Sequence, residues 1–352
     1  MKLAERKLIP QIEQALRESL AKVPSLRMRK VNPSLAQAAD GPDLALLVRG
    51  GGAEKTLLVE VKPLGQPRMA REAVNALARY AQRLPKSYPV FAAPYISGSA
   101  AAICTANAVG YIDLAGNCLL RFGGVYIERS GNSNPFSERR ELRSLFSPKA
   151  SRVLRVLLLG AGRVWKLQEL AREAEVSLGH VSNVKWLLAA REWVREGNGG
   201  LSLSKPESLL LEWSRNYGYR KNSPREFFSL LSLPELEASL AQACQRKGWR
   251  YALTGFSGAA RLTPTVRHFR AMTYFDGDIR SLSEELKLED ASSGPNLTVL
   301  TPYDEGVFYG AAEREGVYLT SPVQIYLDLA GFRGRGEEAA EAILREVLKP
   351  NW

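Results

Sequence analysis

Hydrophobic residues in the first 130 positions switch repeatedly between helical and strand spacing. Leu8, Ile12, Leu16 and Leu20 recur every four residues within 4–22, which predicts an amphipathic opening helix. Short apolar or alternating runs, which are typical of strands, lie at 26–31, 43–48, 56–61, 89–93, 111–114 and 119–129. Further helical patterns lie between them, at 68–84 and 97–108. Strands that alternate with helices favour an α/β domain over 1–130, with its sheet covered on both faces.

The pattern changes after residue 130. Residues 131–147 are mostly polar and are predicted to form a linker. Three short helical patterns follow at 149–159, 166–174 and 178–190, and two strand-like pieces then flank a glycine-rich turn at 196–200. Three helices and a hairpin in this order are typical of a winged helix-turn-helix, so this fold is predicted for 148–205.

Residues 206–352 mix both periods. Helical patterns lie at 207–217, 224–246 and 337–348, and strand-like stretches lie at 250–253, 298–300 and 316–320. This mixture favours a C-terminal α+β domain. The whole chain is therefore expected to be multidomain, with α/β and α+β parts.

Composition narrows the class of protein. No uninterrupted apolar run approaches the roughly 18 residues that a membrane span needs, so no membrane partner is expected. The charged N-terminal segment lacks the apolar core of a signal peptide. The three cysteines lie far apart, as in proteins of the reducing cytoplasm, where we expect this chain to act. With two histidines and no paired cysteines, no structural zinc site is expected.

The net charge of +11 is unevenly distributed along the chain. Residues 1–130 contain 18 Lys and Arg against 10 Asp and Glu, and residues 131–205 contain 13 against 7. Residues 206–352 are slightly acidic, with 17 against 20. This asymmetry favours a polyanion as the partner of the first two parts, although a generally basic solvated surface gives the same count.

One constellation in the first domain carries candidate chemistry. Asp43 begins a predicted strand, and Glu60 and Lys62 end the next one. Residues two apart on a strand share a face, and a hairpin would bring Asp43 beside Glu60. Two adjacent carboxylates can hold Mg²⁺, and a neighbouring lysine can orient the water that attacks a phosphodiester. The alternative is an exposed strand end with a satisfied salt bridge.

The order of elements around these residues resembles the PD-(D/E)xK nuclease superfamily, the restriction-endonuclease-like α/β sandwich, over about 3–130. The resemblance implies that Asp43 and Glu60 hold the metal and that Glu13, or alternatively Glu18, assists from the first helix. RecB-related members carry Gln-x-x-x-Tyr on the next helix. Tyr80 matches that tyrosine, but Ala76 stands at the glutamine position.

A second polar cluster lies between two apolar strands, at Asp113 and Asn117. Both side chains could line the same cleft as the carboxylates. Gly116-Asn117 is also a favoured hairpin pair, and we interpret the cluster as turn chemistry.

The third helix of the predicted winged helix carries candidate DNA-reading residues. His180, Ser182, Asn183 and Lys185 lie on its outward side, near the end that meets base edges. Asn183 could read adenine, and Lys185 could reach guanine or phosphate. Phosphate contacts are predicted for Arg195 of the wing and for three rim residues, Arg152, Arg155 and Lys166. Double-stranded DNA is the expected partner.

Two runs in the C-terminal part resemble the AbiEi family of antitoxins and transcriptional regulators of type IV toxin–antitoxin systems. They are Ser-Pro-x-Gln-x-Tyr-x-Asp-Leu at 321–329 and Arg-Gly-Glu-Glu-Ala at 335–339, and the resemblance covers about 148–352. It implies repression of the chain's own operon and neutralisation of a nucleotidyltransferase toxin without stable complex formation. Simpler members begin at the winged helix, so the nuclease-like domain is a departure.

Three functional hypotheses follow. The leading one is a DNA-binding regulator, with a cognate toxin and a second copy of the chain as further candidate partners. The alternative is a Mg²⁺-dependent DNA endonuclease that the winged helix targets. The third is a protein-interaction scaffold without salt-dependent affinity for DNA.

Overall fold

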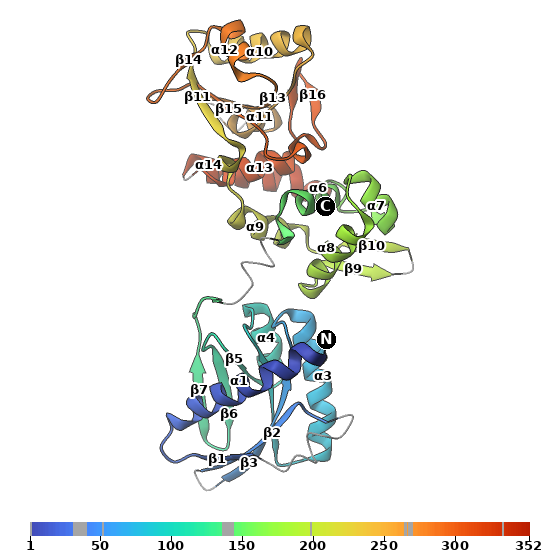
Figure 1. Ribbon diagram of the computed structural model, residues 1–352, viewed down its shortest axis with the longest axis vertical. Coiled ribbons are helices and arrows are strands. Elements are labelled where there is room, and N and C mark those ends of the chain that lie inside the picture. Colours follow the sequence, from blue (N-terminus) through green and yellow to red (C-terminus); the bar gives the residue numbers. More distant parts are fainter. Residues whose placement is uncertain are drawn as a thin grey trace. The chain divides into compact units, whose positions relative to one another are not determined.

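The computed structural model describes residues 2–30, 41–50, 53–135, 144–197, 199–263, 266, 270–332 and 334–352. The predicted linker lies partly outside these residues, at 136–143, as do the last residue of the strand predicted at 26–31 and parts of two glycine-rich turns. The chain forms two compact units (Figure 1). Unit 1 comprises Met1–Glu141 with Ala189–Glu192, and unit 2 comprises Leu142–Leu188 with Trp193–Trp352.

Unit 1 is built on a seven-stranded sheet whose strands follow one another in sequence order, from β1 to β7. Its elements are α1 (Lys2–Ala21), β1 (Arg27–Lys30), β2 (Leu44–Gly50), β3 (Ala53–Val61), α3 (Pro67–Arg83), β4 (Ser87–Ala93), α4 (Gly98–Ala106), β5 (Gly110–Asp113), β6 (Cys118–Phe122) and β7 (Val125–Arg129). The central pairs β3–β4 and β4–β5 are parallel, with α3 and α4 as crossovers, and the outer pairs are antiparallel.

The alternation of β3 divides unit 1 into two cores. Leu57 and Val59 point to one face of the sheet, where they pack with buried residues of α1 such as Leu16. Leu58 points to the other face and packs with residues of α3 such as Leu77. Because side chains alternate along a strand, the even-numbered positions after Leu58 also belong to the face that α3 and α4 cover.

The first part of unit 2 contains three helices and a small sheet. The elements are α6 (Pro148–Leu159), β8 (Val164–Trp165), α7 (Leu167–Glu173), α8 (Leu178–Ala190), β9 (Val194–Gly197) and β10 (Gly200–Leu203). The last two residues of α8 are those that the division of the chain counts with unit 1. The strands lie in the order β8-β10-β9, so the hairpin β9–β10 is joined to the strand before α7. Leu154, Leu170 and Leu188, one from each helix, are fully buried.

The second part of unit 2 is a mixed sheet with helices, in the strand order β14-β11-β15-β13-β12-β17-β16. Its elements are α9 (Pro206–Asn216), η1 (Tyr219–Asn222), β11 (Pro224–Phe228), α10 (Leu233–Lys247), β12 (Arg250–Leu253), α11 (Gly255–Leu262), β13 (Ala271–Asp276), α12 (Ile279–Leu286), β14 (Glu289–Asp290), β15 (Leu297–Leu300), η2 (Glu305–Phe308), β16 (Ala312–Arg314), β17 (Val317–Leu319), α13 (Pro322–Ala330), α14 (Arg335–Ile343), η3 (Leu344–Leu348) and η4 (Lys349–Asn351).

The mixed α/β, multidomain fold class predicted from the sequence is confirmed. The prediction of one long helix at 224–246 is wrong. Residues 224–228 form β11, which pairs with β15 and β14, and α10 begins only at Leu233. Ser232 and Glu235 form a capping box at this start, which satisfies main-chain N–H groups of the first turn. Pairing with distant strands therefore overrides the local helical pattern. The boundaries proposed at 130, 147 and 205 stay predictions.

Candidate functional sites

Asp43, Glu60 and Lys62 share one face of the unit 1 sheet. β2 and β3 are antiparallel with Leu44 opposite Val59, so Asp43, which immediately precedes β2, stands opposite Glu60. Lys62 follows Glu60 by two positions and continues on the same face. The fold thus brings together the three residues that the sequence singled out.

Both carboxylates have partners that offset part of their negative charge. Lys62 Nζ lies 2.7 Å from Glu60 Oε1, and the main-chain N–H of Val61 donates to Asp43 Oδ2 at 2.8 Å. Burial raises the pKa of Asp43, and the hydrogen bond and the charge of Lys62 oppose this shift only in part. Burial and then the charges of Glu60 and Asp43 raise the pKa of Tyr80, so this tyrosine of α3 is close enough to feel both carboxylates.

Of the carboxylates predicted for a metal site, the fold brings Asp43 and Glu60 together. Glu13 lies on α1, which covers the opposite face of the sheet, and it pairs with Arg17 at 2.7 Å. Glu18 accepts a hydrogen bond from the glutamine one turn before it. Within the described ranges, no three His, Cys, Asp or Glu side chains form a group that could hold a metal. Asp43 and Glu60 therefore form a pair of carboxylates, of which Glu60 is bonded to Lys62.

Asp113 and Asn117 brace a turn. Asp113 is buried, and its carboxylate accepts hydrogen bonds from the main-chain N–H of Asn117 at 2.8 Å, the Asn117 side chain at 2.9 Å and the main-chain N–H of Ile96 at 3.2 Å. The Asn117 amide oxygen accepts from Asn132 N–H at 2.9 Å. These contacts support the interpretation as turn chemistry, because each oxygen of the carboxylate is already satisfied.

The residues predicted to read DNA lie on α8 as expected from its periodicity. Ser182 and Asn183 are exposed. His180 is half-buried, and in the described part of the chain its buried Nε2 has no hydrogen-bond partner. Lys185 Nζ lies 2.9 Å from Glu196 Oε2 of β9. A phosphate would have to displace this carboxylate to bind Lys185.

Two further candidates for phosphate contacts are accessible. Arg195 is exposed on β9, and Lys166 is exposed at the start of α7. The sequence reasoning missed Trp186, which is 48% exposed and follows Ser182 by one helical turn. A large aromatic residue on an otherwise polar stripe was the available signal, since exposed tryptophan is uncommon on a surface without a partner.

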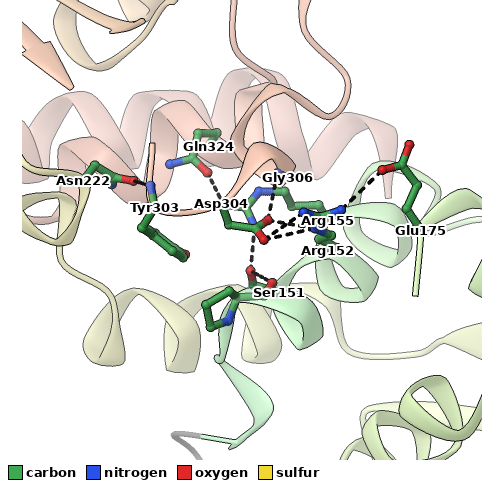
Figure 2. Close-up of polar contacts among 10 residues, drawn as sticks. Ser151, Arg152, Arg155, Glu175, Asn222, Tyr303, Asp304, Gly306 and Gln324 are labelled. Atoms are coloured by element: carbon green, nitrogen blue, oxygen red, sulfur yellow. Dashed lines mark hydrogen bonds and ion pairs between the residues drawn. The ribbon is translucent and has the colours of Figure 1, made fainter. Parts of the chain in front are cut away.

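Arg152 and Arg155 correct the sequence interpretation. Both arise from α6, and Figure 2 shows them pointing toward the second part of unit 2. Arg155 is fully buried and donates to Ser151 Oγ at 2.9 Å and to Gln324 Oε1. Arg152 donates through Nε and Nη2 to Asp304, at 2.9 and 3.0 Å. Their guanidinium groups therefore join the two parts of unit 2 and are not rim contacts for phosphate.

A buried polar network on α13 was also missed. Asp328 is fully buried and accepts hydrogen bonds from Tyr217 at 2.7 Å, Tyr274 at 2.9 Å, Gln324 at 3.0 Å and Thr254 at 2.6 Å. Gln and Asp four residues apart in an otherwise apolar run were the sequence signal. Such a pair occupies one helix face, and buried polar groups need partners.

Comparison with known proteins adds one finding. Residues 202–349 match the model of a family described as "Transcriptional regulator, AbiEi antitoxin, Type IV TA system". This match supports the resemblance for the second part of unit 2, including the runs at 321–329 and 335–339. No curated protein and no solved structure matches the chain. Across the described residues, every helix is too short or too polar to cross a membrane.

Proposed function

We propose that this chain is a cytoplasmic DNA-binding transcriptional regulator related to AbiEi antitoxins, and that it represses its own operon. The observation that carries the proposal is the family match over 202–349. The structure attaches this part firmly to the helical module before it, through Arg152 and Arg155. A regulator needs a DNA-reading module of this kind beside its family-specific domain.

The helical module is proposed to be a winged helix-turn-helix. The order α6, α7, α8 and the hairpin β9–β10, with β8 completing the sheet, supports this proposal. In such a module α8 enters the major groove and the hairpin contacts the backbone. The exposed Asn183 of α8 and the exposed Arg195 of the hairpin are then the expected base and phosphate contacts.

Footprinting on the DNA upstream of the chain's own coding sequence tests the proposal. We expect a protected site whose affinity falls steeply with salt, and much weaker binding to unrelated duplex of equal length. Equal affinity for both duplexes would contradict specific regulation. Co-expression with a neighbouring nucleotidyltransferase toxin tests the antitoxin role, for which we expect rescue of growth.

We further propose that the nuclease-like domain of unit 1 binds DNA and does not cleave it. The sheet with helices on both faces supports a restriction-endonuclease-like fold, but Glu60 is already paired with Lys62. A shared fold does not by itself imply the same activity, because the activity depends on the residues of the site. Incubation of supercoiled plasmid and branched DNA with the chain and Mg²⁺ or Mn²⁺ tests the endonuclease alternative. Cutting that Asp43→Ala abolishes would establish that alternative.

A further inference from the structure

A groove in the second part of unit 2 has the size of a small-molecule site. It encloses about 810 Å³, within the range of roughly 300–1,000 Å³ that is usual for ligand pockets. Its walls come from α10, the start of β12, the end of η2 and the hairpin β16–β17. Four aromatic residues line it: Trp249, Tyr251, Phe308 and Tyr318. Aromatic walls of this kind suit a planar ring.

The helical wall of the groove is built from small and amide side chains. Ala238, Ala241, Gln242 and Gln245 line it, at the spacing of one helix face. The alanines leave the space open, because no side chain beyond Cβ fills it. Gln242 and Gln245 are both exposed, and each offers an amide that can donate to or accept from the edge of a ring.

Arg250 supplies the charge at one end. It is exposed, and its guanidinium carbon lies 4.2 Å from the centre of the Phe308 ring. Among the residues that the structure describes, it makes no ion pair. This contact places the guanidinium carbon over the face of the ring and leaves the N–H groups available to a ligand. A flat guanidinium of this kind is suited to bind a carboxylate or phosphate through paired hydrogen bonds.

We propose that this groove binds a small planar aromatic ligand that carries one anionic group. The ring packs among the aromatic walls, the amides of α10 contact its polar edge, and Arg250 binds the anion. Glu313 and Glu315 of the β16–β17 hairpin also line the groove. Their charges disfavour a polyanion such as a nucleic acid strand, and a ligand with one anionic group must place that group at Arg250, away from this hairpin.

The segment around η2, which lines the groove beside Arg250, also contacts the helical module of α6 and α7. Phe308 ends η2, and Asp304, which caps η2, binds Arg152 of α6. The next residue after η2, Tyr309, donates its hydroxyl to Glu173 of α7 at 2.8 Å. A ligand at Arg250 and Phe308 therefore contacts the segment that positions α6 and α7. We expect occupancy of the groove to change DNA affinity, an expectation that rests on the proposed function.

Calorimetric titration of the full chain tests the site itself. The probes are adenosine monophosphate and indole-3-acetate, which distinguish a nucleotide from an aromatic carboxylate, and adenosine as the uncharged control. We expect one of the two anions to bind, and adenosine to bind about tenfold more weakly than its monophosphate if the nucleotide is the ligand. Failure of both anions to bind at millimolar concentration overturns the proposal.

Three variants locate the binding. Arg250→Met is expected to weaken the anion about tenfold, and Ala238→Trp to abolish binding by filling the groove. Arg246→Met is the matched control, because Arg246 is an exposed arginine of α10 that pairs with Glu285 instead of lining the groove. Equal effects of Arg250→Met and Arg246→Met, or unchanged binding to Ala238→Trp, would contradict the assignment.

DNA affinity measured with and without the bound probe tests the coupling separately. Wild-type affinity should shift at least threefold, and the shift should vanish in Arg250→Met. An unchanged DNA affinity in the presence of bound probe would contradict the coupling, but not the proposed binding site. Absence of DNA binding without any probe removes the proposed function and leaves the titration result standing.

Discussion

Arg155 of α6 donates a hydrogen bond to Gln324 Oε1 of α13, 169 positions later in the chain, and both side chains are fully buried. The Gln324 amide nitrogen in turn donates to Asp328 Oδ1 at 3.0 Å. A buried cation and a buried anion are thus connected through one amide. The guanidinium also lies 5.0 Å from the ring centre of Trp213, so its charge is stabilised by a π face as well as by hydrogen bonds.

Arg155→Ala is expected to lower the free energy of unfolding of the full chain by about 2–4 kcal/mol. The change leaves Gln324 Oε1 without its donor and opens a cavity beside Trp213. Urea denaturation measures the effect as a lower midpoint. Arg172→Ala, at an exposed arginine of α7, is the control and should change the free energy by less than about 0.5 kcal/mol. Equal stability of the two variants would contradict the structural role of Arg155.

Asp328 should make stability depend on pH. Burial raises its pKa above 3.8, and hydrogen bonds from four neighbours oppose this only in part. Between 3.8 and the raised pKa, the folded chain therefore holds a proton that the unfolded chain has lost. Lowering the pH through this window favours the folded state.

The measurement is the difference in free energy of unfolding between the wild type and Asp328→Asn from pH 8 to pH 4. The wild type should gain stability relative to the variant as the pH falls, whatever the offset between the two proteins. A difference that is constant, or that changes in the opposite direction, would show that Asp328 does not titrate as its burial implies.

Asn183→Ala is expected to weaken binding to the chain's own operator about tenfold or more, and binding to unrelated DNA much less. A side chain that reads a base contributes roughly 1–3 kcal/mol of discrimination. Arg215→Ala, on the exposed side of α9, is the control. Titration by fluorescence anisotropy measures both affinities. Unchanged specificity in Asn183→Ala would remove this residue from the recognition surface.

Because Lys185 and Glu196 form an ion pair, substitutions at the two residues are expected to change DNA affinity in opposite directions. Lys185→Ala should weaken DNA binding and reduce the slope of log affinity against log salt by about 1. Glu196→Gln should strengthen binding, because Lys185 is then released for phosphate. The same anisotropy titrations at several salt concentrations measure both effects. Weaker binding by Glu196→Gln would show that the pair positions the lysine instead of competing for it.

Asp113→Ala is expected to destabilise unit 1 by about 2–3 kcal/mol, since three donors lose a buried acceptor. Asn107→Ala, at an exposed helix end in the same unit, is the control and should cost much less. Thermal unfolding followed by circular dichroism measures both. A similar loss in the two variants would indicate that the turn is not held by this carboxylate.

The order of elements in unit 1 could be predicted because local spacing and packing agree there. Leu57, Leu58 and Val59 alternate between two cores, and each strand is bounded by turn residues. The prediction of a helix over the whole of 224–246 was wrong because local spacing and packing disagree there. Its first five residues also suit a strand, and pairing with β15 decides between the two. Spacing alone does not reveal such a distant partner.

For the candidate sites, spacing along the chain is enough to predict which residues share a strand or helix face, because side chains repeat with periods of 2 and 3.6 residues. Asp43 beside Glu60 and the outward stripe of α8 are of this kind. The partner of each charged group depends instead on how elements that are distant in the chain pack together. Arg152 and Arg155 sit on a basic helix, yet they bind Asp304 and Gln324, more than 150 positions away. A guanidinium serves a phosphate or a buried acceptor equally well, and the packing of distant elements chooses between them.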